Sequence, residues 1–405
     1  MATLHFENLR GRAVTRDPRE EHRASTPLEL FFDLTFVVAV GRVADAYQHE
    51  LAVGETARGV VYGGLMFFGI WWAWMNFTWF ATAHDADDVP YRLLTFVQIT
   101  GALVFAAGVT RAVEVRWFVA CVAGYVIMRV GLVLSWLRVA RDEPTSRTRA
   151  LRYATLIAAV QVLWVGMLAL PVEAQLWVFV LLGAAELAIP VVAERALPEP
   201  PFHAEHIEER YGLFTIILLG ESVLSAAAGF QEAVDDGGLT GGLLAVGLGS
   251  LLIAFAAWWL YFDNPGHLAP TPAVAFRWGY GHIVVFGSLA AIGGGLHLAA
   301  SSQGHDADID ARTAALAVAV PVAGYLVGLA VLLRIVGDRV SGTRIWPKLA
   351  GAAAAAALGA IANVPVTVVG CGLLLAGLAA AMVVIHESPA RAGSPRRSLQ
   401  SADER

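Results

Sequence analysis

Long apolar stretches alternate with short polar ones along most of the chain. A helix needs about 20 consecutive, mostly apolar residues to cross the hydrocarbon core of a bilayer. The eleventh apolar stretch is the weakest, because its run from Ala352 to Ala357 is only mildly hydrophobic. The pattern predicts an all-α, polytopic integral membrane protein with about 12 transmembrane helices: 27–48, 58–80, 91–110, 117–138, 151–170, 174–193, 207–228, 239–262, 274–299, 314–335, 345–363 and 366–386.

Composition supports this class of protein. Hydrophobic residues make up 57% of the chain and charged residues 15%, whereas a soluble domain carries about 25% charged residues. The chain therefore lacks the polar residues to cover a soluble enzyme or a nucleic-acid-binding domain. Its two cysteines, Cys121 and Cys371, both fall inside apolar segments, where buried, inert thiols are expected.

The distribution of arginine predicts the topology. Cytoplasmic loops of membrane proteins hold the excess of Lys and Arg. Arginines are concentrated in the first 26 residues, in the loops near 138–152 and 334–348, and after residue 387, whereas the loop at 232–236 is acidic. The first 26 residues also lack the apolar core of a secretory signal. We therefore expect the inner (cytoplasmic) membrane, with both termini cytoplasmic.

The two halves of the chain resemble each other, which predicts a 6+6 parallel pseudo-repeat of the kind some transporters have. The matches in chain order are Glu29, Gly41 and Arg42 with Glu208, Gly220 and Glu221; Trp71–Trp72 with Trp258–Trp259; and Arg92 with Arg277. Chance matching among aromatic-rich helices is the alternative. The predicted divisions are a cytoplasmic tail (1–26), a first six-helix half (27–193), a cytoplasmic linker (194–206), a second half (207–386) and a disordered cytoplasmic tail (387–405).

Ionisable residues inside the predicted spans are the first candidates for function. Such residues are costly in lipid and usually face a partner or a water-filled path. An ion path and structural pairing between helices both explain them, and we expect Glu221 to pair with Arg42 across the pseudo-symmetry axis. The candidate intramembrane charges are Asp33, Arg42, Arg129, Glu186 and Glu221.

A second set of polar residues collects at the predicted cytoplasmic ends of the helices. Glu29 and Asp33 are four residues apart and share one helix face. A functional vestibule and a plain solvated rim both predict such charges, but Asp33 and His282 lie too deep for a rim. The candidate vestibule consists of Glu29, His84, Asp85, Asp87, Asp88, Arg92, His206, Glu209, Arg210, Asp263, Arg277 and His282.

Two metal sites are weaker alternatives. His203, His206 and Glu209 could place three ligands on one helix face, although this spacing is common. The aspartates at 85, 87 and 88 could hold Mg²⁺ and a diphosphate, as aspartate-rich loops of membrane prenyltransferases do. The second half offers mainly Asp263 as a counterpart, so we assign no metal site, no cofactor and no catalytic residue.

Three blocks of sequence resemble the bacterial low temperature requirement protein A family. They run from Thr26 to Val40, from Trp71 to Leu93, and from His206 to Ser222. The resemblance implies a bacterial inner-membrane protein named for a growth requirement at low temperature, and it implies no particular reaction. A looser likeness is to the lysosomal potassium and proton channel family, whose first-helix Phe-Ser-Asp motif corresponds here to Phe31-Phe32-Asp33 without the serine.

Three functions are compatible with these features. The first is a passive or secondary mover of a small ion or solute, with protons among the candidates, because intramembrane charges occur without a nucleophile or a phosphate-binding loop. The second is a membrane-embedded enzyme acting on a lipid or isoprenoid at the cytoplasmic face. The third is a non-catalytic role in membrane homeostasis. The expected partners are the lipid bilayer and an unknown small ion or solute, and we expect no nucleic acid.

Overall fold

The computed structural model describes residues 11–17, 23–199, 201–263, 271–304, 309–337, 341–361 and 363–387. All regular structure in this part of the chain is helical, and each predicted span corresponds to one helix, which confirms the all-α prediction. The helices are α1 (Pro27–Ala52), α2 (Thr56–His84), α3 (Val89–Glu114), α4 (Val119–Asp142), α5 (Arg147–Met167), α6 (Val172–Ala193), α7 (Ala204–Gly237), α8 (Gly241–Phe262), α9 (Pro272–Ser301), α10 (Ala311–Val336), α11 (Ser341–Ile361) and α12 (Val364–Glu387).

Ten of these helices are long and apolar enough to cross a membrane, which makes the chain a multi-pass membrane protein. The other two are α1 and α11. Helix α11 is rich in alanine, which is only mildly hydrophobic, and it carries Arg344 and Lys348. Helix α1 contains too many charges for its length, namely Glu29, Asp33, Arg42, Asp45 and Glu50.

Side-chain caps define where several helices begin. Thr26 and Glu29 form a capping box at the start of α1, and Pro27 occupies the first turn. Asp88 accepts a hydrogen bond from the backbone N–H of Tyr91 at the start of α3, and Thr240 caps α8 in the same way. These oxygens satisfy backbone donors that have no partner within the helix. The sequence pattern therefore places the helix starts close to their observed positions.

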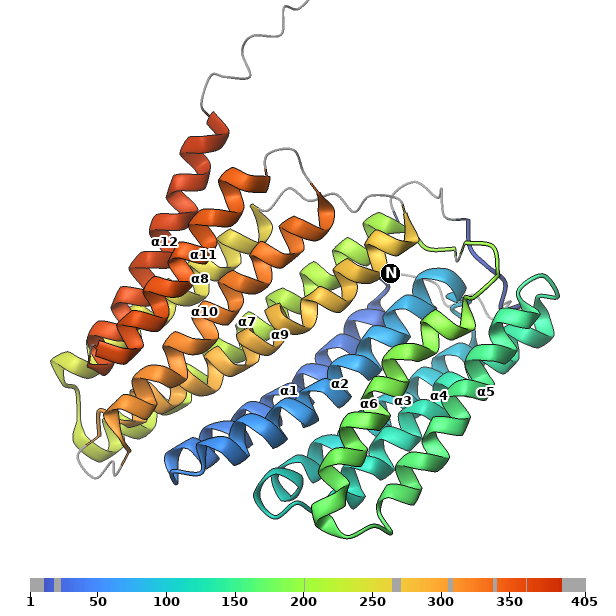
Figure 1. Cartoon of the computed structure of the whole chain (residues 1–405), viewed down its shortest axis with the longest axis horizontal. Coiled ribbons are helices and arrows are strands. Elements are labelled where there is room, and N and C mark those ends of the chain that lie inside the picture. Colours follow the sequence, from blue (N-terminus) through green and yellow to red (C-terminus); the bar gives the residue numbers. More distant parts are fainter. Residues whose placement is uncertain are drawn as a thin grey trace, which may run out of the picture.

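The two halves have the same order of neighbouring helices. In the first half α1 packs against α3, α3 against α4, α4 against α5 and α5 against α6; in the second, α7, α9, α10, α11 and α12 follow the same order. The halves lie side by side, and α1 and α2 contact α7 and α9 (Figure 1). This order agrees with a six-helix repeat, which stays a prediction because α8 lies close along α12 whereas α2 and α6 are farther apart. The matched tryptophans differ in environment, because Trp71 and Trp72 are buried whereas Trp258 and Trp259 are exposed.

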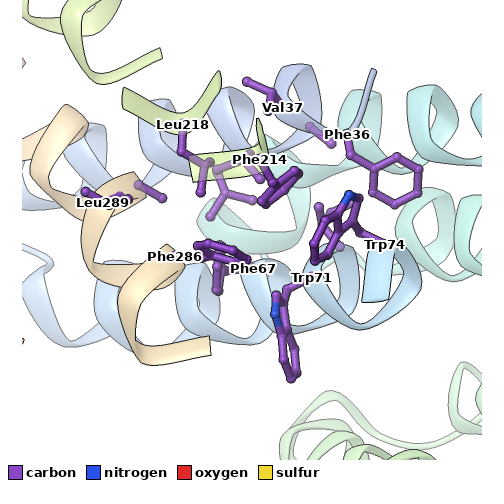
Figure 2. Close-up of a cluster of buried hydrophobic side chains, with 14 of the residues drawn as sticks. Phe36, Val37, Phe67, Trp71, Trp74, Phe214, Leu218, Phe286 and Leu289 are labelled. Carbon is purple, nitrogen blue, oxygen red and sulfur yellow. The ribbon is translucent and has the colours of Figure 1, made fainter. Parts of the chain in front are cut away.

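Large apolar side chains fill the joint between the halves. Trp74 of α2 stacks on Phe214 of α7 with ring centroids 4.2 Å apart, and Phe286 of α9 meets both rings (Figure 2). Aromatic pairs at these distances contribute beyond their buried area. This aromatic joint holds the two halves together.

The described part of the N-terminal segment packs against the bundle. The side-chain and backbone donors of Thr15 bind Glu143 at 2.6 and 3.0 Å, and the backbone N–H of Ala13 binds Asp142 at 3.1 Å. Arg23 is buried and donates to the carbonyls of Ala81 and Thr82 at the end of α2. Residues 11–17 and 23–26 therefore cover the ends of α2 and α4. Residues 388–405 of the predicted C-terminal tail lie outside the described part of the chain.

Candidate functional site

Two pairs of ionisable residues meet where α1 crosses α7. Glu29 and Asp33 lie one helical turn apart on α1, and His206 and Arg210 lie one turn apart on α7, so each pair occupies one face of its helix. All four side chains have 0% exposure. We call these four residues the charge cluster. It combines residues predicted separately as intramembrane charges and as vestibule.

Arg210 is the centre of the charge cluster. Its Nε and Nη2 donate to the two oxygens of Asp33 at 3.1 and 2.5 Å. Its Nη1 lies 2.9 Å from Oε1 of Glu29, an ion pair without the alignment of a hydrogen bond. The fork of Arg210 thus binds Asp33 in the bidentate arrangement that guanidinium and carboxylate favour, and it also faces Glu29.

His206 bridges the cluster to α2. Its Nδ1 lies 3.0 Å from the hydroxyl of Thr82, and its Nε2 lies 3.4 Å from Oε2 of Glu29. A neutral imidazole with the proton on Nε2 would donate to Glu29 and accept from Thr82. A second proton on the ring would turn the contact with Glu29 into an ion pair.

Two further side chains position the carboxylates. The indole Nε1 of Trp74 donates to Oδ1 of Asp33 at 2.7 Å. The backbone N–H of Thr26 donates to Oε2 of Glu29 at 2.8 Å, which completes the capping box of α1. Both carboxylates are therefore fixed by neutral donors as well as by Arg210.

The direct contacts of the charge cluster leave an excess of negative charge. Two carboxylates face one guanidinium, and His206 is the remaining basic group in contact. With a neutral His206 the four residues carry a net charge of −1, and one added proton makes them neutral. A proton taken up by His206 or by one of the carboxylates would therefore cancel the excess negative charge.

A second buried ion pair lies wholly within the first half. Arg129 of α4 is 3.6 Å from Glu186 of α6, and its Nη2 donates to the hydroxyl of Tyr125 at 2.5 Å. Glu186 accepts three further N–H bonds, from Trp72 at 3.0 Å, Gln161 at 2.9 Å and Trp164 at 3.3 Å. This site contains one acid and one base, and its geometry is that of a structural tie between helices.

The predicted pair between Arg42 and Glu221 is wrong. Arg42 binds Asp45, one turn along its own helix, at 3.1 Å. Glu221 instead lies over Gly41, where a Cβ atom would be 2.5 Å from its Oε1. Arg42 pairs with Asp45 because residues three apart on one helix are neighbours. This pairing requires no displacement of α7.

The aspartates between α2 and α3 each face an arginine. Asp85 lies 3.6 Å from Arg16, Asp87 lies 3.0 Å from Arg92, and Arg138 binds both oxygens of Asp88. Burial raises the pKa of the Asp85 carboxyl to about 6, and the nearby carboxylate of Glu29 acts in the same direction. Asp85 is thus a titratable group in the loop between α2 and α3 that interacts with Glu29 of the charge cluster.

The remaining vestibule residues do not join this site. His282 is buried in the second half, where it contacts the carbonyl of Trp278 at 2.8 Å and the hydroxyl of Tyr261 at 3.1 Å. Arg277 is exposed and donates to a carbonyl of its own helix. The others lie elsewhere, with Asp263 at the end of α8, His84 beside Phe80 and Trp136, and Glu209 accepting from the backbone N–H of Ser25. One ring lined by both halves is therefore not formed.

The proposed metal ligands do not converge. Nδ1 of His203 accepts from the backbone N–H of His206 as the cap of α7, while the ring of His206 faces Glu29 and Thr82. Within the described ranges, no group of three or more His, Cys, Asp and Glu side chains is placed to hold a metal ion.

Sequence reasoning missed the neutral donors of both buried sites. Trp72 and Trp74 each donate the indole N–H to a carboxylate. A buried tryptophan usually finds a partner for this group. A run of tryptophans on a helix next to acidic spans is the signal that could have indicated this role.

Comparison with known proteins identifies the family of this chain. The profile described as "Bacterial low temperature requirement A protein (LtrA)" matches residues 24–385. The chain belongs to this family. Another protein similar to it is the uncharacterized protein RA0937 of Rhizobium meliloti (strain 1021), which is 27% identical over 306 residues, 71% of each chain. No solved structure matches the chain. The LtrA match includes every residue of the charge cluster.

Proposed function

We propose that this LtrA protein moves a small ion, the proton, across the membrane, and that the charge cluster is its exchange site. The observation that carries the proposal is the burial of two carboxylates against one guanidinium at the joint between the halves. Uncompensated charge at this depth costs several kcal/mol. A bound proton would neutralise the surplus charge, so the protonated state of a transport cycle would not carry this cost.

The contrast with the pair of Arg129 and Glu186 supports a functional role. A site that only ties helices together is neutral when it holds equal numbers of acids and bases, as that pair does. The charge cluster carries one surplus carboxylate, and its histidine becomes charged only when it takes up a proton. It also lies between the halves, where transporters with repeats place their binding sites.

We propose that protons reach the cluster by a route from the predicted cytoplasmic side. Asp85, whose pKa is raised to about 6, precedes Glu29 and His206 along this route. Beyond Asp33, the stacked rings of Trp74 and Phe214 close the interior (Figure 2). We propose that this end faces the cytoplasm of the inner membrane, that both termini lie there, and that the cycle includes an opening of the aromatic joint.

The alternative of a lipid- or isoprenoid-modifying enzyme receives less support. An enzyme of the membrane prenyltransferase type would need the aspartates at 85, 87 and 88 to hold a metal ion. Each of them already faces an arginine of the chain.

The test is proton flux into proteoliposomes, read with an internal pH-sensitive dye under an imposed membrane potential. Asp33→Asn leaves Glu29 and Arg210 as a balanced pair, so we expect a folded protein with at least ten-fold lower flux. Glu186→Gln is the matched control, because it neutralises an equally buried carboxylate outside the cluster, and it should keep its flux per folded molecule.

Two results would contradict the proposal. One is an Asp33→Asn variant with wild-type stability and wild-type flux. The other is a wild-type protein that moves neither protons nor K⁺ nor Na⁺ above empty liposomes, which would favour a non-catalytic role in membrane homeostasis.

A further inference from the structure

The outer face of α1 changes from apolar to charged along its length. Phe31, Leu34 and Val38 are exposed at helical spacing, and Arg42 and Asp45 continue the same stripe with side chains 52% and 50% exposed. Arg42 lies fifteen residues after Pro27, about 22 Å along the helix at 1.5 Å per residue. The hydrocarbon core is about 30 Å thick, so these charges lie at membrane depth.

Glu221 adds a third charge to this face. Its carboxylate lies against Gly41 of α1, which places it beside Arg42, and it stands near the middle of α7. Arg42 is bound to Asp45 at 3.1 Å, and among the described residues no cation lies within ion-pair distance of Glu221. We call Leu34, Val38, Arg42, Asp45 and Glu221 the α1 face.

Exposure of the α1 face to lipid is unfavourable. A charged side chain in the hydrocarbon core costs several kcal/mol unless water or protein covers it. Val223 and Leu224 of α7 are exposed next to Glu221, so the charges lie within an apolar surface. An apolar surface that contains a few charges of both signs suits a protein partner better than it suits an aqueous channel wall.

We propose that a second copy of this chain covers the α1 face, in a two-fold dimer where Arg42 of each protomer binds Glu221 of the other. Two copies inserted in the same orientation are related by an axis along the membrane normal, so each residue meets residues of its own depth. Such an interface is isologous and must be self-complementary. The α1 face meets this condition because Arg42 and the carboxylate of Glu221 lie at one level, and Arg42 binds Asp45 through a single nitrogen, which leaves other donors of the guanidinium for a second carboxylate.

Cysteine cross-linking in native membranes tests this interface. The chain's own cysteines, Cys121 and Cys371, are buried and can be replaced by alanine. We expect Val38→Cys to form a disulfide-linked dimer under mild oxidation. Val162→Cys on α5, 71% exposed, is the matched control and should remain monomeric.

Light scattering of the purified protein provides the second measurement. Wild type should have the mass of a dimer, Glu221→Gln should shift the population toward monomer at least ten-fold, and the double variant Arg42→Glu with Glu221→Arg should recover the dimer. This result is independent of proton flux, so the interface and the proposed function can fail separately.

Three outcomes would overturn the dimer. A monomeric mass at all concentrations is the first, and equal cross-linking at positions 38 and 162 is the second. The third is fast labelling of Asp45→Cys by a charged, membrane-impermeant maleimide, which would place the face in a water-filled crevice.

Discussion

Replacement of Glu186 is expected to lower the free energy of unfolding. In Glu186→Gln the amide oxygen can still accept from Gln161 and Trp164, but the amide nitrogen then faces the N–H groups of Trp72 and Arg129. Arg129 is left as a buried cation with the Tyr125 hydroxyl as its remaining hydrogen-bond acceptor. Breaking a buried ion pair by removing one partner costs about 3–5 kcal/mol, and we expect this loss in the free energy of unfolding.

Replacement of Arg129, the other member of the pair, should lower the free energy of unfolding less. In Arg129→Met the carboxylate of Glu186 keeps three N–H donors, and hydrogen bonds to a charged group contribute about 1.5–3 kcal/mol each. We expect a loss of about 1–3 kcal/mol for Arg129→Met. The asymmetry follows from the neutral donors, which surround the acid and not the base.

Steric trapping in detergent micelles measures these free energies at equilibrium. Glu173→Gln is the matched control, because Glu173 is exposed in the first turn of the same helix and should change stability by less than about 1 kcal/mol. The reasoning is refuted if Arg129→Met destabilises the protein as much as Glu186→Gln, or if Glu186→Gln matches Glu173→Gln.

Two other predictions concern packing and pH. A Cβ at Gly101 would lie 2.6 Å from backbone atoms of Gly124 and Met128, so Gly101→Ala should separate α3 from α4 and lower stability by about 1–3 kcal/mol; Gly64→Ala, which meets nothing within 4 Å, should be neutral in the same unfolding assay. Burial raises the pKa of Asp85 to about 6, so its contribution is fully present below the unfolded value near 4 and is lost as pH rises through 6. Thermal unfolding should therefore show wild type gaining stability relative to Asp85→Asn between pH 7.5 and 5, and parallel curves would contradict the raised pKa. Arg16, Arg23 and Glu29 are the charged groups that act on Asp85, and the backbone N–H of Asp87 donates a hydrogen bond to its carboxylate.

The number and order of helices could be predicted from the sequence, because each crossing requires its own apolar run. The ends were less predictable where helices continue beyond the apolar run. Helix α7 was predicted as 207–228 but extends over Ala204–Gly237, since polar residues such as Gln231 and Glu232 end the hydropathy signal without ending the helix. The length of an apolar run reflects the thickness of the hydrocarbon core, whereas the helix itself can continue beyond that run.

The partners of the buried charges could not be predicted. The shared face of Glu29 and Asp33 follows from their spacing, whereas their contact with Arg210, 177 residues beyond Asp33, depends on how the halves dock. Arg42 and Glu221 are matched positions of the predicted repeat, and such a match does not imply contact. Arg129 and Glu186 were each predicted at mid-span, and the fold brings them together through α4 and α6.

The ion pairs of α1 with α7 bear on how the protein is made. Helix α1 is synthesised before the other eleven helices, yet it is one of the two that do not qualify as a span by length and composition. The cation that binds Glu29 and Asp33 is on α7 and is synthesised only after five more helices. During this interval α1 must be retained by the insertion machinery or by a shallow position at the membrane surface. Membrane integration of the first helix is therefore completed by the second half of the chain, and the order of synthesis differs from the order of assembly.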